Sequence, residues 1–120
     1  MNSEIDLKER TKAFALRVIA MFVRLPRTDV ARVLGKQVLR SSTSVGANYR
    51  EADEGRTKAE FISKMGDSLR EISESQYWLE LLGESKTVKP ANMAARLDEA
   101  QQLKLIFATI IRKTRRDDDQ

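Results

Sequence analysis

Basic side chains recur at four-residue steps in the middle of the chain, at Arg32, Lys36 and Arg40. On a helix this spacing places three cations on one face, where they could neutralise nucleic acid phosphates. Between Arg24 and Arg70 the chain carries ten Lys and Arg against six Asp and Glu, an excess equal to the net charge of +4. We therefore predict a nucleic-acid-binding surface, with a solvated, salt-bridged helix face as the alternative. The candidate residues are Arg32, Lys36, Arg40, Arg50, Arg56 and Lys58, which Arg24, Arg27 and Lys64 could extend.

Small polar residues fill the stretch from Arg40 to Ala52. Ser, Thr, Gly and Asn are mediocre helix formers, yet here they lie in the middle of an expected helix. Small residues let another helix approach closely, and polar ones can bond across to it. The alternatives are packing within the chain, an interface between subunits, and a ligand site. At 100° per residue, Ser41, Ser44, Asn48 and Glu51 fall on one flank of the apolar stripe, and Ser42 and Gly46 on its other edge.

The chain contains no His and no Cys. Disulfides, thiol catalysis and thiolate metal sites are therefore excluded, as is the commonest general base near neutral pH. The paired Glu-x-x-His motif of di-metal helical bundles cannot form either. Serines without a His partner form no recognisable nucleophilic site, and no Gly-rich phosphate loop is present. We predict no catalytic residue, no metal, no cofactor and no enzymatic activity.

The chain length and composition predict a single domain with few, long elements. Its 120 residues suffice for one core, and the 5 Gly and 2 Pro leave little material for turns. Apolar residues recur at three- and four-residue steps, which is the helical period. We predict an all-α, antiparallel up-down-up-down four-helix bundle spanning 1–120. The expected helices are 3–25, 28–54, 57–83 and 90–114, with a frayed tail at 115–120.

Local signals set these boundaries. Helices are expected to start at Thr28, at a capping box of Thr57 and Glu60, and at Pro90. They are expected to end before Pro26, at a left-handed Gly55, and at Gly83. The expected inward residues include Leu7, Thr11, Phe14, Val18, Met21, Val30, Leu34, Val38, Val45, Met65, Ile72, Leu79, Met93, Ala100, Phe107 and Ile111.

Several helices carry apolar residues on a second side as well. A monomeric bundle should keep one polar face on each helix, so a second apolar face predicts contact with another subunit. Scattered surface residues are the alternative. The second faces comprise Leu16, Ile19 and Val23; Tyr77, Trp78, Leu81 and Leu82; and Leu105 and Ile106.

The N-terminal residues alternate acids and bases, which is unlike a signal peptide, and no apolar run reaches the length of a membrane span. We therefore expect a cytoplasmic protein with no membrane contact.

The run from Leu39 to Ala52 resembles the signature of a bacterial four-helix-bundle family first known from intervening sequences of large-subunit ribosomal RNA genes. Arg56, Lys58, the segment 60–62 and the segment 77–82 also match its pattern. The similarity spans nearly the whole chain. The expected family-signature or interface residues are Ser41, Ser44, Gly46, Asn48, Glu51 and Trp78, with Arg50 also a signature position.

This resemblance implies a closed homo-oligomer, in known relatives a pentameric ring, and it does not imply an enzyme. A related branch, the accessory proteins of diversity-generating retroelements, forms basic pentameric barrels that engage a reverse transcriptase and nucleic acid. The expected function is thus a self-assembling interaction protein that binds structured RNA or another nucleic acid. The alternative is a protein-directed scaffold or adaptor with no nucleic-acid role.

Overall fold

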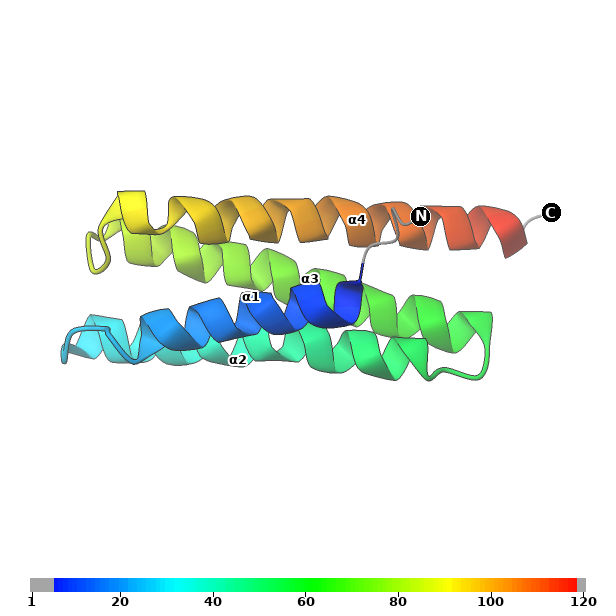
Figure 1. Ribbon diagram of the computed structural model, residues 1–120, viewed down its shortest axis with the longest axis horizontal. Helices are drawn as coiled ribbons and strands as arrows, with labels where there is room; N and C mark the ends of the chain where they lie inside the picture. Colours follow the sequence, from blue (N-terminus) through cyan, green and yellow to red (C-terminus); the bar gives the residue numbers. More distant parts are fainter. Residues whose placement is uncertain (1–5, 119–120) are drawn as a thin grey trace.

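The computed structural model describes residues 6–118, with side chains through Asp117. Four helices follow in order: α1 (Leu7–Phe22), α2 (Asp29–Asp53), α3 (Lys58–Glu84) and α4 (Ala94–Asp118). A short 3₁₀ helix, η1 (Pro90–Asn92), precedes α4. Figure 1 shows that α1 and α3 run in one direction and α2 and α4 in the other. The all-α, four-helix prediction is confirmed, and the described residues contain no strand.

The predicted helix starts at Thr28 and Thr57 are confirmed. The Thr28 hydroxyl accepts from the Ala31 N–H at 3.1 Å, and the Thr57 hydroxyl accepts from the Glu60 N–H at the same distance. The Glu60 carboxylate, however, accepts from the Arg56 N–H at 2.7 Å, one residue before the expected partner. The first helix begins at Leu7 with Asp6 as its cap, and the expected start at 3–5 lies outside the described residues.

Two predicted helix ends are wrong. The first helix ends at Phe22, before the expected limit of 25, because its last turn tightens: the Arg24 and Leu25 N–H groups donate to the Met21 and Phe22 carbonyls. The second helix ends at Asp53, and Glu54 is its cap. No described glycine has a positive φ, so Gly55 is not a left-handed cap.

The α3–α4 connection also departs from expectation. Helix α3 continues past Gly83 to Glu84, and the left-handed residue of the turn is Lys86, with φ 62°. Gly83 is instead a close-packing position, since a Cβ there would lie 3.2 Å from Met93 Cγ. Pro90 starts only the short η1. Helix α4 begins at Ala94 and runs to Asp118, so 115–118 of the expected frayed tail are helical, whereas 119–120 lie outside the described residues.

The core follows the predicted stripes, except that Val30 is not inside and that Leu82, expected on a second apolar side, is fully buried in the core. Phe14, Val18 and Val38 are fully buried, as are Met65, Ile72 and Phe107 on the later helices. Val30 is 52% exposed, however, and Ala31 occupies the inward position instead. The first turn of α2 therefore presents Ala31, its smallest apolar side chain, to the interior.

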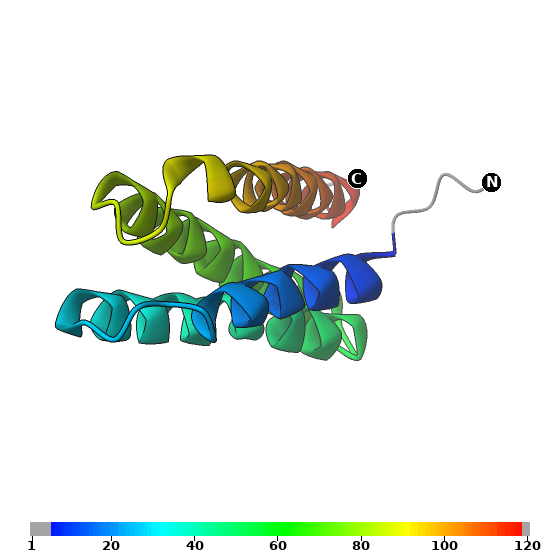
Figure 2. The same cartoon turned by 60° about the vertical axis from the view of Figure 1, so that its left-hand side comes forward.

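The extent of contact differs between neighbouring helices of the bundle. Helices α2 and α3 share the most extensive contact, whereas α1 and α4 touch along a short length. Figure 2 shows the open angle between α1 and α4. The Arg10 guanidinium of α1 pairs with the Glu99 carboxylate of α4, at 2.7 Å. None of the helices within residues 6–118 has the length and hydropathy that crossing a bilayer requires.

Candidate functional site

The predicted basic row of Arg32, Lys36 and Arg40 lies on the exposed side of α2. Its charge is largely compensated by neighbouring carboxylates. Arg32 pairs with Asp29 in the same helix, and Arg40 reaches across to Glu71 and Glu74 of α3. Lys36 alone in the row forms no ion pair with a described residue. The structure therefore corresponds more closely to the salt-bridged helix face that we considered as the alternative.

Arg40 and Trp78 bind the same carboxylate. The Trp78 indole donates to Glu74 Oε2 at 3.1 Å, and this bond, with that from Arg40, lowers the pKa of Glu74. The hydrogen bonds that Arg40 donates to Glu71 and Glu74 in turn raise the pKa of Arg40. Glu71 Oε1 is buried without a hydrogen-bond partner among the described residues. These contacts tie α2 to α3 and neutralise the Arg40 end of the row, whereas Lys36 has no carboxylate partner among the described residues.

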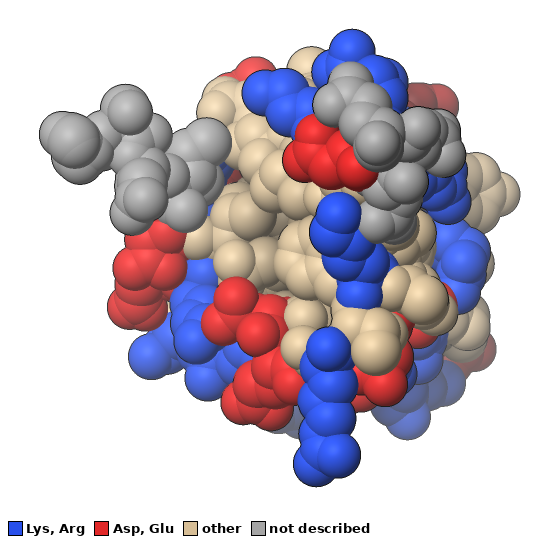
Figure 3. All heavy atoms as spheres, turned by 90° about the vertical axis from the view of Figure 1, so that its right-hand side faces the viewer, with Lys and Arg blue, Asp and Glu red and all other residues tan. Residues whose placement is uncertain are grey.

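The remaining candidate cations lie around the α2–α3 turn. Arg56 lines a shallow depression together with Glu51, Glu54 and Glu60. Arg50 and Lys58 are exposed nearby in the sequence. Figure 3 shows this end of the bundle, where acidic and basic side chains intermingle around an uncharged area. The six predicted nucleic-acid-binding residues therefore do not gather into one basic surface free of carboxylates.

The small residues of α2 divide between interior and surface. Ser41 is fully buried and its hydroxyl lies 2.8 Å from that of Ser75 on α3. Gly46 faces α1, where a Cβ would meet Thr11 Oγ1 at 3.0 Å. For these two residues, packing within the chain accounts for the small side chain.

Other expected signature residues stay closer to the surface. Ser44 and Asn48 are half-buried, and the Ser44 hydroxyl donates to the Arg40 carbonyl at 2.8 Å. Glu51 is exposed and pairs with Lys64 of α3 at 2.8 Å. Trp78 is half-buried beside the exposed Tyr77, with ring centroids 5.1 Å apart. Among the described residues, no group of three or more carboxylates is placed to hold a metal ion.

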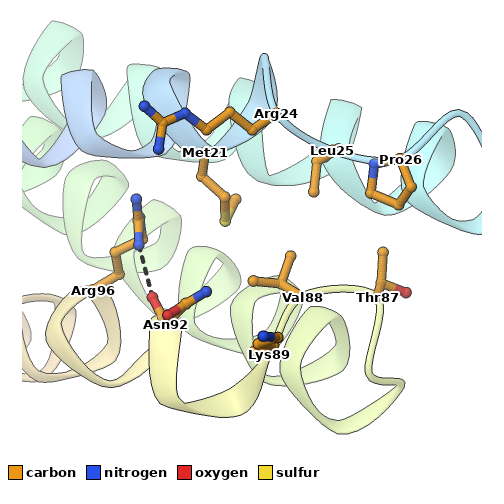
Figure 4. A pocket seen from close by; sticks show the side chains of 9 residues that line it. All are labelled: Met21, Arg24, Leu25, Pro26, Thr87, Val88, Lys89, Asn92 and Arg96. Atoms are coloured by element: carbon orange, nitrogen blue, oxygen red, sulfur yellow. Dashed lines mark hydrogen bonds between the residues drawn. The ribbon is translucent and has the colours of Figure 1, made fainter.

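A different basic feature lies at the opposite end of the bundle. A pocket of about 530 Å³ opens where the α1–α2 turn meets the α3–α4 turn (Figure 4), and we call it the turn pocket. Arg24, Lys89 and Arg96 line it, and no Asp or Glu does. Its apolar wall comes from Met21, Leu25, Pro26 and Val88.

Arg96 is held in place by backbone rather than by carboxylates. Its Nε donates to the Arg17 carbonyl at 3.2 Å, and its guanidinium also donates to the Asn92 carbonyl at 2.7 Å. Burial and then the charges of Arg17 and Arg24 lower the pKa of Arg96. A cation that is partly desolvated among other cations favours the approach of an anion.

Sequence reasoning missed most of the turn pocket. Of its cations only Arg24 was considered, as an extension of the basic row. A signal did exist, because alternating helices place the first and third turns at the same end, so charges beside Pro26 and Pro90 must come together. The missed residues are Lys89, Arg96 and the neighbouring Arg17.

Comparisons with known proteins support the resemblance drawn from residues 39–52. The sequence model described as 23S rRNA-intervening sequence protein matches residues 3–108. A solved structure of a protein with unknown function from the S23 ribosomal protein family of Bacteroides thetaiotaomicron VPI-5482 is 33% identical, with a TM-score of 0.81. The similarity covers 87% of this chain and 96% of that chain. The search of curated proteins gave no match. The chain belongs to the 23S rRNA-intervening sequence protein family.

Proposed function

We propose that this protein is a non-catalytic interaction protein that assembles with copies of itself and binds the phosphate backbone of structured RNA. The observation that carries the RNA-binding part is a set of cations without ion pairs near both ends of the bundle. Arg40, in the middle of α2, is matched by two acids, whereas several cations near both ends of the bundle form no ion pair with a described residue. These end cations are Arg17, Arg24, Lys89 and Arg96 at one end and Arg112, Lys113, Arg115 and Arg116 at the other.

The mode of recognition that we propose is electrostatic. Unpaired Lys and Arg side chains release counterions from a phosphate backbone, which supplies affinity without reading bases. Stacking on bases would need exposed aromatic rings, and Tyr77 alone among the aromatic side chains is exposed. We therefore propose that the cations near the ends of the bundle recognise a folded RNA by its shape and charge rather than by its base sequence.

The absence of catalysis is part of the proposal and rests on the hydroxyl groups. Ser41, Ser42 and Ser44 donate to carbonyls of their own helix, and Ser68 donates to the Val45 carbonyl. A hydroxyl bonded in this way has no base to activate it. The sequence also has no His to act as that base.

Self-assembly is supported by an apolar stripe on the outside of α1. Leu16, Ile19 and Val23 lie on the side opposite the buried Phe14 and Val18, and we call them the outer stripe. Val23 is 72% exposed. Apolar residues in a row on a helix exterior favour burial against another protein surface. We propose a second copy of the chain as that surface and, from the family resemblance, a pentameric ring.

Filter binding with a structured RNA hairpin across a salt series tests the RNA-binding part. The combined variant Arg112→Gln, Arg115→Gln, Arg116→Gln should weaken binding and reduce the salt slope by up to about 0.9 for each lost phosphate contact. The matched control is Arg32→Gln, Lys36→Gln, Arg40→Gln, which removes the same charge from the basic row and should weaken binding less. Absence of RNA retention at low salt would overturn this part of the proposal.

A protein-directed scaffold is the second candidate, and the exposed Tyr77 favours it. This ring lies beside Trp78 and near the neutralised part of the basic row, where a protein partner would meet little excess charge. Aromatic anchors are typical of protein interfaces. The scaffold predicts a partner that remains bound after nuclease treatment and at high salt. An RNA-dependent association would instead be lost under both conditions.

A further inference from the structure

The turn pocket is built by two separate connections of the bundle. The α1–α2 turn supplies Arg24, Leu25 and Pro26, and the α3–α4 connection supplies Val88 and Lys89. Each connection contains a proline, which restricts its backbone and so favours a preformed pocket. Arg96 enters from the first turn of α4, and Figure 4 shows Met21 between the two connections. The pocket therefore exists only in the folded bundle.

The charge on this pocket is unbalanced. Arg24, Lys89 and Arg96 line it without an acidic residue, and the Arg17 carbonyl holds Arg96 in place. The Arg96 guanidinium has five N–H donors, and backbone carbonyls accept from only some of them. The remaining N–H groups can bind a ligand. The Arg24 side chain forms no hydrogen bond or ion pair with any described residue. Two guanidinium groups and an ammonium group thus line the pocket, with no carboxylate among its lining residues.

This combination favours a phosphate over a carboxylate. A phosphate offers up to two charges and several acceptor oxygens, which match forked guanidinium donors at two positions. A carboxylate would neutralise a single cation and leave the others repelling one another. The charge and the number of donors therefore indicate a phosphoryl group.

The other half of the pocket is apolar, so the phosphate should carry an organic group. Met21 is 5% exposed, and Leu25 and Val88 are half-buried around it. A volume of about 530 Å³ lies within the range of roughly 300–1,000 Å³ that is typical of small-molecule sites. An inorganic phosphate would leave this wall in contact with water.

We propose that the turn pocket binds a nucleoside phosphate, with Arg24, Lys89 and Arg96 on the phosphate and Met21, Leu25 and Val88 against the nucleoside. The ligand could be a free mononucleotide or a nucleotide of a bound RNA. Binding of a nucleotide of RNA rests on the proposed RNA-binding function, whereas binding of a free mononucleotide goes beyond that function.

Calorimetric titration of the full chain with 5′-AMP tests the proposal. We expect saturable binding, at least ten-fold weaker binding of adenosine and of inorganic phosphate, and a loss of roughly ten-fold in affinity for Arg24→Gln. Lys12→Gln removes an equal charge from an exposed position on α1 and should leave the affinity for 5′-AMP unchanged. Because Arg96 also holds two backbone carbonyls, Arg96→Gln could alter the turn, and its circular dichroism must match that of the wild type.

Three results would overturn the proposal: no saturable heat with 5′-AMP, equal losses for Arg24→Gln and Lys12→Gln, or inorganic phosphate binding as tightly as 5′-AMP. Competition with a 5′-phosphorylated RNA oligonucleotide separates the two sources. Displacement of the RNA by 5′-AMP, lost in Arg24→Gln, supports a nucleotide of RNA, whereas binding of 5′-AMP without any effect on RNA supports a free mononucleotide. If the protein retains RNA but does not bind 5′-AMP, the pocket proposal is wrong, whereas the proposed RNA-binding function is still supported.

Discussion

The hydroxyl oxygens of Ser41 and Ser75 lie 2.8 Å apart between α2 and α3, and both side chains are fully buried. Each hydroxyl therefore supplies the other with the partner that a buried polar group requires. The pair also keeps the helices close, because serine adds little bulk at the crossing. A few residues along, the Ser68 hydroxyl donates to the Val45 carbonyl at 2.8 Å, so small polar groups line much of this seam.

A double-mutant cycle should reveal this coupling. Ser41→Ala and Ser75→Ala should each lower the free energy of unfolding by about 1 kcal/mol, since each leaves the other hydroxyl with a poorer partner. The double variant should lose less than the sum, with a coupling energy of about 0.5–1.5 kcal/mol. Urea unfolding at neutral pH measures all four proteins.

The control for this cycle is Ser44→Ala. Its hydroxyl is bonded only to the Arg40 carbonyl of its own helix and is half-buried, so the change should stay within about 0.5 kcal/mol. Strictly additive losses for Ser41 and Ser75 would mean that the two hydroxyls do not stabilise each other.

Two glycines in helix interiors should respond oppositely to substitution. A Cβ at Gly46 would lie 3.0 Å from Thr11 Oγ1, and Thr11 is buried with its hydroxyl bonded to the Leu7 carbonyl at 2.6 Å. Gly46→Leu should therefore destabilise by about 1–3 kcal/mol through overpacking of α1 against α2.

Gly66 provides the matched comparison, because a Cβ there would meet nothing within 4 Å. Gly66→Ala should stabilise by up to about 1 kcal/mol through helix propensity alone. Thermal unfolding followed by circular dichroism measures both variants. A stabilised Gly46→Leu protein would contradict the close α1–α2 approach seen here.

The starts of α2 and α3 could be predicted from the sequence because the interactions that define them are local. Thr28 and Thr57 bond to N–H groups three residues ahead, so the residue type and the spacing suffice. The ends depend on contacts distant in sequence. Gly83 does not stop α3, because its function is to admit Met93 from the following turn. A glycine chosen for close packing cannot be distinguished from a cap before the neighbour is known.

The candidate site was less predictable for the same reason. Arg40 meets carboxylates 31 and 34 residues away in sequence, so the charge of the basic row could not be judged from α2 alone. The turn pocket joins Arg24 of the α1–α2 turn to Arg96 of α4, which come together only through the bundle topology. By contrast, the period of the apolar residues was sufficient to predict four helices and most of the core.

Acid should weaken the contact between Glu74 and Trp78. The pKa of Glu74 is lowered, first by the indole hydrogen bond and then by Arg40, so its charged form is favoured in the folded state. Such a group contributes stability above the ordinary Glu pKa of 4.5, and that contribution is lost as the pH falls through the lower folded value. Glu74→Gln should therefore be less stable than the wild type at neutral pH, and the difference should shrink in acid.

Trp78 is the only tryptophan, so its fluorescence reports directly on this carboxylate. We expect an emission change in the folded wild type with a midpoint below pH 4.5, absent from Glu74→Gln. Glu80→Gln removes an exposed carboxylate of the same helix that forms no ion pair with described residues, and it should retain the transition. A midpoint above pH 4.5 would show that Glu74 is not stabilised in its charged form.

The outer stripe on α1 should govern the mass of the protein in solution. Val23 is 72% exposed and Leu16 is 54% exposed, so a charge at either position should leave the core of one bundle intact. If another copy covers this stripe, Val23→Glu would bury an unpaired carboxylate in the interface and so favour dissociation. Light scattering should give a multiple of the 13.7 kDa subunit for the wild type, five-fold for the proposed ring, and a lower mass for Val23→Glu.

Thr43→Glu is the control for this prediction, since it adds the same charge at an exposed polar position of α2 and should leave the mass unchanged. Circular dichroism should be alike in all three proteins, which separates dissociation from unfolding. A wild-type mass of 13.7 kDa at micromolar concentration would refute self-assembly. An unchanged oligomer in Val23→Glu would place the interface elsewhere on the bundle. Loss of the oligomer should also weaken RNA binding, because each ring presents its unpaired cations several times to one polyanion.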